Sequence, residues 1–289
     1  MKEILLNNLP QFSDWIKLAL SEQGLSVNHK TVKEVIREYQ DEKWGSALQE
    51  VEGLSKPTLE DVEIKLESIN QEFPFYIRDK FYFGLGREIF DAHLNLYMET
   101  IVPYIKNASC LVELGAGYGS KILNLSQKDE LNDFPLYAAE FTQSGCDLIS
   151  ILAHSVNKDV NVGYCDFREL ELKDITIPEN AIIFTSLATM YIPELSDDFI
   201  AFLSDLKPLV VVHFEPCYEH HSVNELHGLL CRRYIELNDY NRNLISVVNE
   251  STNNNKIVSK SKINAIGTNP LLPISVIEWM PIAKKLNGK

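Results

Sequence analysis

A buried strand that runs into three alternating glycines is the feature that most constrains how this chain can fold. Residues 111–114 read Leu-Val-Glu-Leu, and Gly115, Gly117 and Gly119 follow at every second position. Glycine has no side-chain wall, so the backbone can turn sharply there and approach a ligand closely. We expect a helix over residues 121–126, with its N-terminus pointing at that ligand. The turn therefore predicts a ligand site at the end of a buried strand.

The spacing of these glycines narrows the ligand class. A dinucleotide fingerprint has the spacing G-x-G-x-x-G, whereas here the last glycine, Gly119, comes one residue early and Ser120 follows it. Glu113 lies two residues before the first glycine. A carboxylate at that place repels phosphate and attracts an ammonium or a sulfonium. An NAD-dependent oxidoreductase is therefore disfavoured.

The pattern E-x-G-x-G-x-G after a strand resembles the first motif of class I S-adenosylmethionine-dependent methyltransferases. In that family the acid lies near the methionyl amino end of the cofactor, and the glycines pass under it. A glycine-rich turn in some other α/β protein is the alternative, because a single motif is weak. The resemblance implies that the residues of this turn that bind S-adenosyl-L-methionine are Glu113, Gly115, Ala116, Gly117 and Gly119.

Two further strands each end in an acid. The strand over residues 135–140 ends in Glu140, and an acid at this place in α/β nucleotide folds accepts hydrogen bonds from the ribose hydroxyls. The strand over residues 160–167 carries Asp166, which resembles the family's adenine-contacting acid, with Phe167 beside the ring. Taken singly, each acid could be an ordinary strand-end or helix-capping residue. We add Phe141 and Ser186 to the predicted cofactor site.

Apolar strands alternate with helical segments through this part of the chain. Strands are expected over residues 181–186 and 209–216, and a helix over residues 142–157. Near-continuous apolar strands separated by helices indicate a parallel sheet that is buried on both faces. An antiparallel pair over residues 256–259 and 275–279 is expected to close it. The predicted fold class is α/β, a doubly wound, seven-stranded, mostly parallel sheet of the class I methyltransferase type with an N-terminal helical extension.

The first part of the chain has a different character. Capping boxes begin at Thr31 and Thr58, and apolar residues follow each at helical spacing. Simple core packing explains these apolar stripes. We predict a helical N-terminal region and a pocket-covering connector over residues 1–86. A Rossmann-like cofactor-binding domain follows over residues 87–289, and it begins with a helix over about residues 87–105.

The connector over residues 73–87 is dense in aromatic side chains and contains two glycines. In class I methyltransferases the segment before the first strand often closes over the cofactor. We therefore predict that Tyr82 and Arg87 contact the cofactor and that Tyr76 contacts the substrate. The alternative is an aromatic hinge between the helical region and the sheet.

A second polar region follows the fifth strand. We expect one long helix from about Val223, with Leu226, Leu230, Leu237 and Leu244 as its buried stripe. Ligands of doubly wound sheets bind outside the carboxyl ends of the strands, so residues that follow strands four and five face the methyl acceptor. A solvated helix face with an incidental pair of histidines is the alternative. The predicted catalytic residues are Glu215, His220, His221 and Tyr191, and the predicted substrate contacts here are Tyr191, Tyr234 and Asn238.

A metal site is not expected. The histidines at positions 220 and 221 are adjacent, and neighbouring histidines rarely bind one ion. The sequence contains no H-x-x-x-H or H-E-x-x-H spacing and no C-x-x-C pair among its five cysteines. We read Cys110, Cys146 and Cys165 as buried thiols of a cytoplasmic protein.

The composition excludes several classes of partner. The formal net charge of −14 argues against non-specific binding of DNA or RNA, which needs clustered Lys and Arg. No apolar run approaches the length of a membrane span, and the N-terminus lacks the regions of a signal peptide. The expected partner is a small-molecule or peptide substrate, with no nucleic acid and no membrane. The oligomeric state is open, and a homodimer is one option.

These observations together predict an enzyme that methylates an N or O atom of a small molecule or peptide. The aromatic connector and the polar segment over residues 232–241 loosely resemble tailoring methyltransferases of natural-product pathways, which places the expected role in secondary metabolism. A protein methyltransferase is one alternative. The other is a non-catalytic subunit that binds S-adenosylmethionine and serves as a scaffold.

Overall fold

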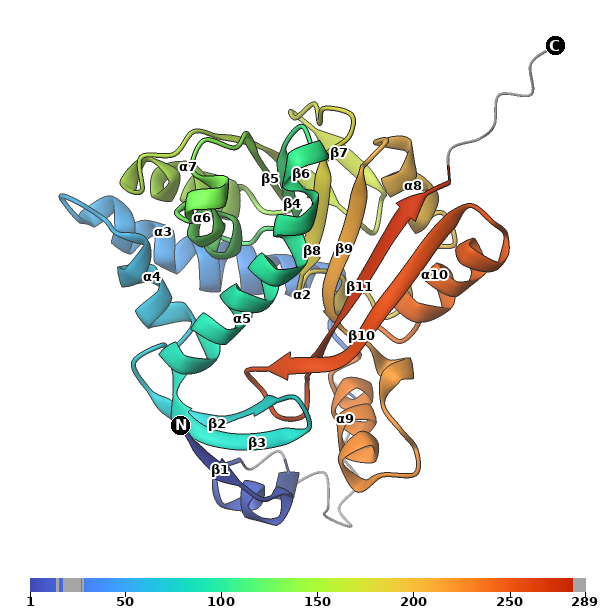
Figure 1. The fold of residues 1–289 in the computed structure, drawn as a ribbon. Coiled ribbons are helices and arrows are strands. Elements are labelled where there is room, and N and C mark those ends of the chain that lie inside the picture. Colours follow the sequence, from blue (N-terminus) through green and yellow to red (C-terminus); the bar gives the residue numbers. More distant parts are fainter. Residues whose placement is uncertain (14–15, 18–26, 28, 283–289) are drawn as a thin grey trace.

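One large sheet organises the molecule (Figure 1). The computed structural model describes residues 1–13, 16, 17, 27 and 29–282. Within this part of the chain, the sheet has eleven strands in the order β1-β3-β2-β10-β11-β9-β8-β4-β5-β6-β7, rather than the seven that the sequence suggested. Its centre is parallel, as expected. The parallel strands are β4 (Leu111–Leu114), β5 (Leu136–Glu140), β6 (Val160–Asp166), β8 (Ile182–Ser186) and β9 (Val210–Pro216).

Antiparallel strands flank this parallel centre on both sides. On one side β11 (Ile274–Pro281) pairs with β9, and β10 (Ile257–Gly267) pairs with β11, which confirms the predicted closing pair. The strand β10 runs on to Gly267, well beyond residue 259, where the predicted strand ended. On the other side the short β7 (Glu171–Lys173) pairs with β6.

The aromatic connector is a hairpin and not a loop. Residues 72–85 form β2 (Glu72–Ile77) and β3 (Lys80–Leu85), joined by Arg78 and Asp79, which both have positive φ. Two central residues with positive φ suit a tight hairpin turn. The strand β2 joins the main sheet through β10, and β1 (Lys2–Ile4) pairs with β3. Alternating aromatic residues therefore extend the sheet here.

Helices cover both faces of the sheet. One face packs against α5 (Gly86–Ile101), α6 (Ser120–Ser126) and α7 (Gln143–Ser155), and the other against α8 (Phe199–Asp205) and α10 (Leu244–Asn253). The alternation of side chains along β9 explains why, since Val210 and Val212 belong to the first core and Val211 to the second. No helix in the described part of the chain is long and apolar enough to cross a membrane.

The N-terminal helices begin where their caps predict. Thr31 and Thr58 each form a capping box, and they begin α2 (Val32–Arg37) and α4 (Leu59–Leu66). Between these helices lie a π-helical turn, η2 (Glu38–Lys43), and α3 (Trp44–Gly53). The remaining short turns are 3-10 helices: η1 (Leu6–Gln11), η3 (Val102–Asn107), η4 (Asp129–Leu131), η5 (Thr189–Tyr191) and η6 (Tyr218–His220).

The prediction of one long helix after the fifth strand is wrong. The segment forms α9 (Leu226–Leu237) and then α10, separated by a turn in which Asp239 has a φ of 51°. Leu226, placed in the buried stripe by the sequence, is 54% exposed. Because α9 packs on the hairpin through Leu230, it does not cover the central sheet.

Candidate functional site

The three glycines shape a tight loop between β4 and α6. Gly115, Gly117 and Gly119 have φ values of 72°, 58° and 83°, a region that side chains disfavour. A Cβ atom on Gly115 would lie 2.4 Å from the Cβ of Ala188, in the loop after β8. The N–H groups of Gly115 and Ala116 donate to the carbonyl of Ala139, which ties the loop to β5. Gly115 therefore allows two loops to meet.

A cavity of about 360 Å³ opens above this loop, at the carboxyl ends of β4, β5, β6 and β8. We call the lining residues from the strand ends and from the segments that directly follow them the floor. Most of the predicted cofactor residues lie there, together with the predicted acceptor contact Tyr191. The predicted residues that line the cavity are Glu113, Gly115, Ala116, Gly117, Glu140, Phe141, Asp166, Phe167, Ser186 and Tyr191. Gly119 does not line it but caps α6.

Two carboxyl groups of the floor are fully buried. Glu113 accepts a hydrogen bond from the N–H of Ile122 at 3.0 Å, and Glu140 accepts one from the N–H of Gly117 at 3.0 Å. Burial raises the pKa of Glu113 to about 8 and that of Glu140 to about 7. A cation in the cavity favours the ionised form of both groups. This part of the floor therefore suits a positively charged ligand.

The third predicted acid is already paired. Asp166 accepts hydrogen bonds from Nε and Nη2 of Arg168 at 2.9 and 2.8 Å. Burial works to raise the pKa of Asp166, but its bonds with Arg168 hold the pKa below the usual range. The guanidinium of Arg168 also lies 5.1 Å from the ring centre of Phe141. This end of the cavity therefore holds a charged carboxylate beside a flat ring.

The N-terminal helices cover the cavity, a position that the sequence did not predict for them. We call their lining residues the roof; they are Val35, Tyr39, Lys43, Trp44, Lys65, Leu66 and Glu67. The N–H of Trp44 bonds to the carbonyl of Tyr39, five residues back, so the π-helical turn places both rings on the cavity side. Tyr39 lies 5.1 Å from Tyr191, and Trp44 lies 5.3 Å from Tyr118, between ring centres. The roof therefore touches the floor through aromatic contacts.

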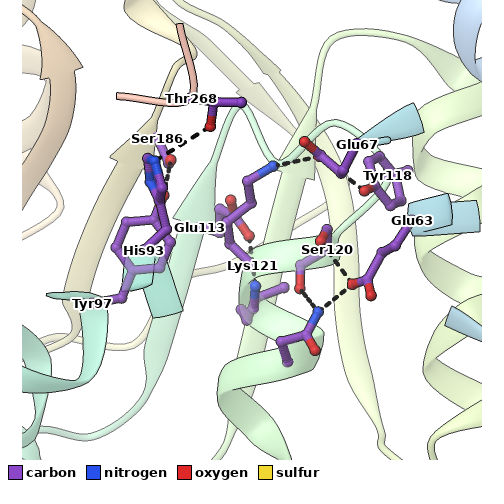
Figure 2. Close-up of polar contacts among 12 residues, drawn as sticks. Glu63, Glu67, His93, Tyr97, Glu113, Tyr118, Ser120, Lys121, Ser186 and Thr268 are labelled. Carbon is purple, nitrogen blue, oxygen red and sulfur yellow. Dashed lines mark hydrogen bonds and ion pairs between the residues drawn. The ribbon is translucent and has the colours of Figure 1, made fainter. Parts of the chain in front are cut away.

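A clamp of carboxylates fixes the roof on α6 (Figure 2). Glu63 accepts hydrogen bonds from Ser120 and Asn124, and Glu67 accepts them from Tyr118 and Lys121. On the other side of the cavity, the hydroxyl of Ser144 donates to the backbone carbonyl of Gln40 at 2.8 Å. The roof is thus held at both ends.

A chain of hydrogen bonds leads from the cavity to the surface (Figure 2). Ser186 lines the cavity, and its hydroxyl lies 2.9 Å from that of Tyr97 on α5. The hydroxyl of Tyr97 lies 3.3 Å from Nδ1 of His93, whose Nε2 lies 3.4 Å from the hydroxyl of Thr268. Thr268 is exposed. Burial lowers the pKa of His93 to about 4, so its ring is neutral at pH 7 and can accept a hydrogen bond.

Glu215 lies behind the cavity wall and does not line the cavity. Its Oε1 accepts hydrogen bonds from the N–H groups of Ala188 and Thr189 at 3.0 and 3.2 Å. Burial raises the pKa of Glu215 to about 7. The loop that it holds contains Leu187, which has a φ of 54° and lines the cavity. Glu215 therefore positions this loop.

The two predicted catalytic histidines also lie outside the cavity. His220 is half-buried, and its Nδ1 lies 2.9 Å from the hydroxyl of Ser275 on β11. His221 is buried, and burial lowers its pKa to about 3. Within the described residues, no group of three His, Cys, Asp or Glu side chains is arranged to hold a metal. The adjacent histidines follow β9 in the sequence, but neither lines the cavity.

The predicted substrate contacts at the end of α9, Tyr234 and Asn238, do not line the cavity. The ring of Tyr234 lies 6.3 Å from that of Tyr240, which in turn lies 5.5 Å from the ring of Tyr191. Asn238 donates from its side chain to the carbonyl of Tyr234 at the end of the helix. Only Tyr191 of this group reaches the cavity.

The structure does not bring the connector residues to the cavity. Tyr76 packs against Phe81 and His227, and Tyr82 lies along a surface groove. Arg87 pairs with Glu60 on the surface. The hairpin joins the sheet beyond β10, which carries these side chains away from the glycine loop.

No protein-family model matches the chain, and a search of curated proteins finds no relative. Magnesium protoporphyrin IX methyltransferase from Synechocystis is similar at a TM-score of 0.47 and 10% identity, over 68% of this chain and 87% of that one. An O-methyltransferase from Bacillus cereus has a TM-score of 0.46 and 10% identity, over 83% of this chain and 99% of that one. The plantazolicin methyltransferase has a TM-score of 0.43 and 11% identity, over 69% of this chain and 91% of that one. These neighbours are class I S-adenosylmethionine-dependent methyltransferases, each solved with S-adenosylhomocysteine.

Proposed function

We propose that this protein transfers the methyl group of S-adenosylmethionine to an N or O atom of a small molecule or peptide. One observation carries the proposal: the glycine loop and the acids Glu113, Glu140 and Asp166 converge on a single cavity. Each acid comes from the end of a different parallel strand. Ligands of such sheets bind at this edge.

The residues of the cavity suit this cofactor. The buried carboxyl groups of Glu113 and Glu140 favour a cation, and the glycine loop leaves room that side chains would fill. By the family resemblance, Asp166 and Phe167 would hold the adenine, Glu140 would hold the ribose, and Glu113 would lie near the methionyl end. When bound, S-adenosylmethionine supplies a sulfonium methyl group that is already activated for transfer.

The chain must then orient the acceptor and remove its proton. Tyr191 lies at the junction of roof and floor, so we assign it to the acceptor side of the cavity. Burial raises the pKa of Tyr191 to about 12, which keeps its hydroxyl protonated as a hydrogen-bond donor. A proton released by the acceptor can pass from Ser186 through Tyr97 and His93 to the exposed Thr268. Glu215 acts here as a positioning residue.

The role that we propose lies in the tailoring of a natural product. The part of the cavity between Tyr39 and Tyr191 supports an organic substrate with a flat or apolar part. The five cysteines are free thiols, which supports a reducing compartment, and we propose that the enzyme works in the cytoplasm.

The test measures formation of S-adenosylhomocysteine by the purified protein with three acceptor pools: phenols and alcohols, amines, and peptides. We expect product with at least one pool, and no product with the Gly115→Ala variant, whose new Cβ would contact Ala188. Failure of the wild-type protein to bind S-adenosylmethionine would overturn the proposal. Binding without product in any pool would favour the non-catalytic scaffold subunit.

A further inference from the structure

One end of the cavity is marked by an ion pair that joins roof to floor (Figure 2). Nζ of Lys121, in the first turn of α6, lies 3.0 Å from Oε1 of Glu67, the residue that caps α4. Both side chains line the cavity, and they are 21% and 29% exposed. The pair is therefore mostly withdrawn from water but remains open to a ligand.

The surroundings keep this pair charged. Burial works to lower the pKa of Lys121, but Glu67, Tyr97 and Glu113 together hold it above the usual range. Burial works to raise the pKa of Glu67, and Lys121 and Tyr118 hold it below the usual range. A partly buried ion pair cannot lose one partner without a large cost, so a ligand that separates the two charges must replace both.

A molecule with an ammonium and a carboxylate on one carbon can make that replacement. Its carboxylate can accept from the ammonium of Lys121, which has three donors, while its ammonium donates to the carboxylate of Glu67. Two new ion pairs then take the place of one, and no charge is left alone. A ligand without this head group leaves the pair closed.

We propose that Glu67 and Lys121 together recognise the amino-acid end of the cofactor, with Lys121 at its carboxylate and Glu67 at its ammonium. This inference rests on the proposed function. It assigns to the N-terminal helical region a direct part in cofactor binding, because Glu67 belongs to the roof. A bound head group would bridge α4 and α6.

A purely structural role of the pair is the competing explanation. The helix α4 is already fixed on α6 without Lys121, since Glu63 bonds to Ser120 and Asn124, and Tyr118 bonds to Glu67. A structural tie would also not need to open onto the cavity. The two roles predict different results for a ligand that lacks the amino-acid end.

The experiment compares calorimetric binding of S-adenosylhomocysteine and methylthioadenosine to the full chain. The second ligand keeps the nucleoside and the thioether but has no amino-acid end. We expect the wild-type protein to bind S-adenosylhomocysteine at least about 30-fold more tightly, as two charge-assisted contacts imply. Lys121→Met should remove most of this preference and change methylthioadenosine binding less than about twofold. Lys121→Arg, which keeps the charge, should retain part of the preference.

Lys260→Met is the matched control, because Lys260 also pairs with a mostly buried glutamate, Glu278, but does not line the cavity. It should leave both affinities unchanged. Equal wild-type affinities for the two ligands would overturn the inference, as would a Lys121→Met variant that weakens both ligands alike. If the wild-type protein binds neither ligand, the proposed function itself fails, and the inference fails with it.

Discussion

The floor and the roof of the cavity are built from different kinds of sequence. The floor comes from short segments at the ends of parallel strands, where the residue type is dictated by the turn or by the ligand. The roof comes from residues 35–67, in which Tyr39 and Trp44 reach the cavity only because the helix widens to a π-helical turn between them. A local sequence pattern therefore predicts the floor, whereas the roof depends on how helices that are distant in the sequence pack over the sheet.

The largest expected effect tests the floor. Gly115→Ala adds a Cβ atom 2.4 Å from that of Ala188, at a φ of 72° that alanine disfavours. We expect S-adenosylhomocysteine to bind about 100-fold more weakly, from backbone strain together with overpacking. Calorimetry measures the loss. Gly53→Ala is the matched control, because its Cβ would meet nothing within 4 Å; if both variants bind alike, the glycine loop is not the ligand site.

A smaller effect should come from the roof. Trp44→Ala removes an aromatic ring that packs against Tyr118 and faces Gly117. We expect cofactor binding to weaken about tenfold, which corresponds to loss of one buried aromatic contact. Leu48→Ala, on the same helix but outside the cavity lining, controls for weaker docking of α3. Unchanged affinity in the Trp44 variant would show that the roof is not part of the cofactor site.

The buried acids of the floor should make stability depend on pH. The pKa values of Glu140 and Glu113 are raised to about 7 and 8, so the folded protein keeps protons that the unfolded chain releases near pH 4.5. The free energy of unfolding should therefore fall as the pH rises from about 5 to about 8. Between pH 6.5 and 8, Glu113→Gln should reduce this fall by about 1 to 2 kcal/mol, measured by chemical denaturation. A fall of the same size in the variant would show that Glu113 is not the source.

The smallest effects on cofactor affinity are expected for residues that the sequence predicted as cofactor contacts but that do not line the cavity. Tyr82→Phe and Arg87→Ala should change cofactor affinity less than about twofold, since the hairpin is distant from the glycine loop and an exposed ion pair contributes little. Tenfold weaker binding in either variant, measured by the same titration, would show that the connector covers the cavity after all.

The sequence predicted the floor because each of its residues is tied to a local signal. Gly115 directly follows an apolar strand, and Glu140 and Asp166 end two more, so topology alone brings them to one edge. The same reasoning placed His220 and His221 beside the acceptor, but neither lines the cavity, since position after a strand does not fix where a side chain points. It also placed the connector over the cavity, whereas its alternating aromatic residues form a hairpin that does not line it.

The sequence hints at the roof but does not show which of its side chains reach the cavity. The five-residue spacing of Tyr39 and Trp44 matches a π-helical turn, but such turns are rare, and the ordinary helical period places the two rings on different faces. The chain of hydrogen bonds through Tyr97 and His93 is even harder to predict from the sequence, since both residues lie on a helix that also packs in the core. Contacts between distant segments decide both features.

Calorimetric titration of the wild-type protein with S-adenosylmethionine, and separately with NAD, tests the central claim most directly. The geometry of the cavity predicts one bound S-adenosylmethionine for each chain and no measurable heat with NAD. No binding of S-adenosylmethionine, or binding of NAD with the same stoichiometry, would contradict the assignment of this cavity to a methyl-donor cofactor.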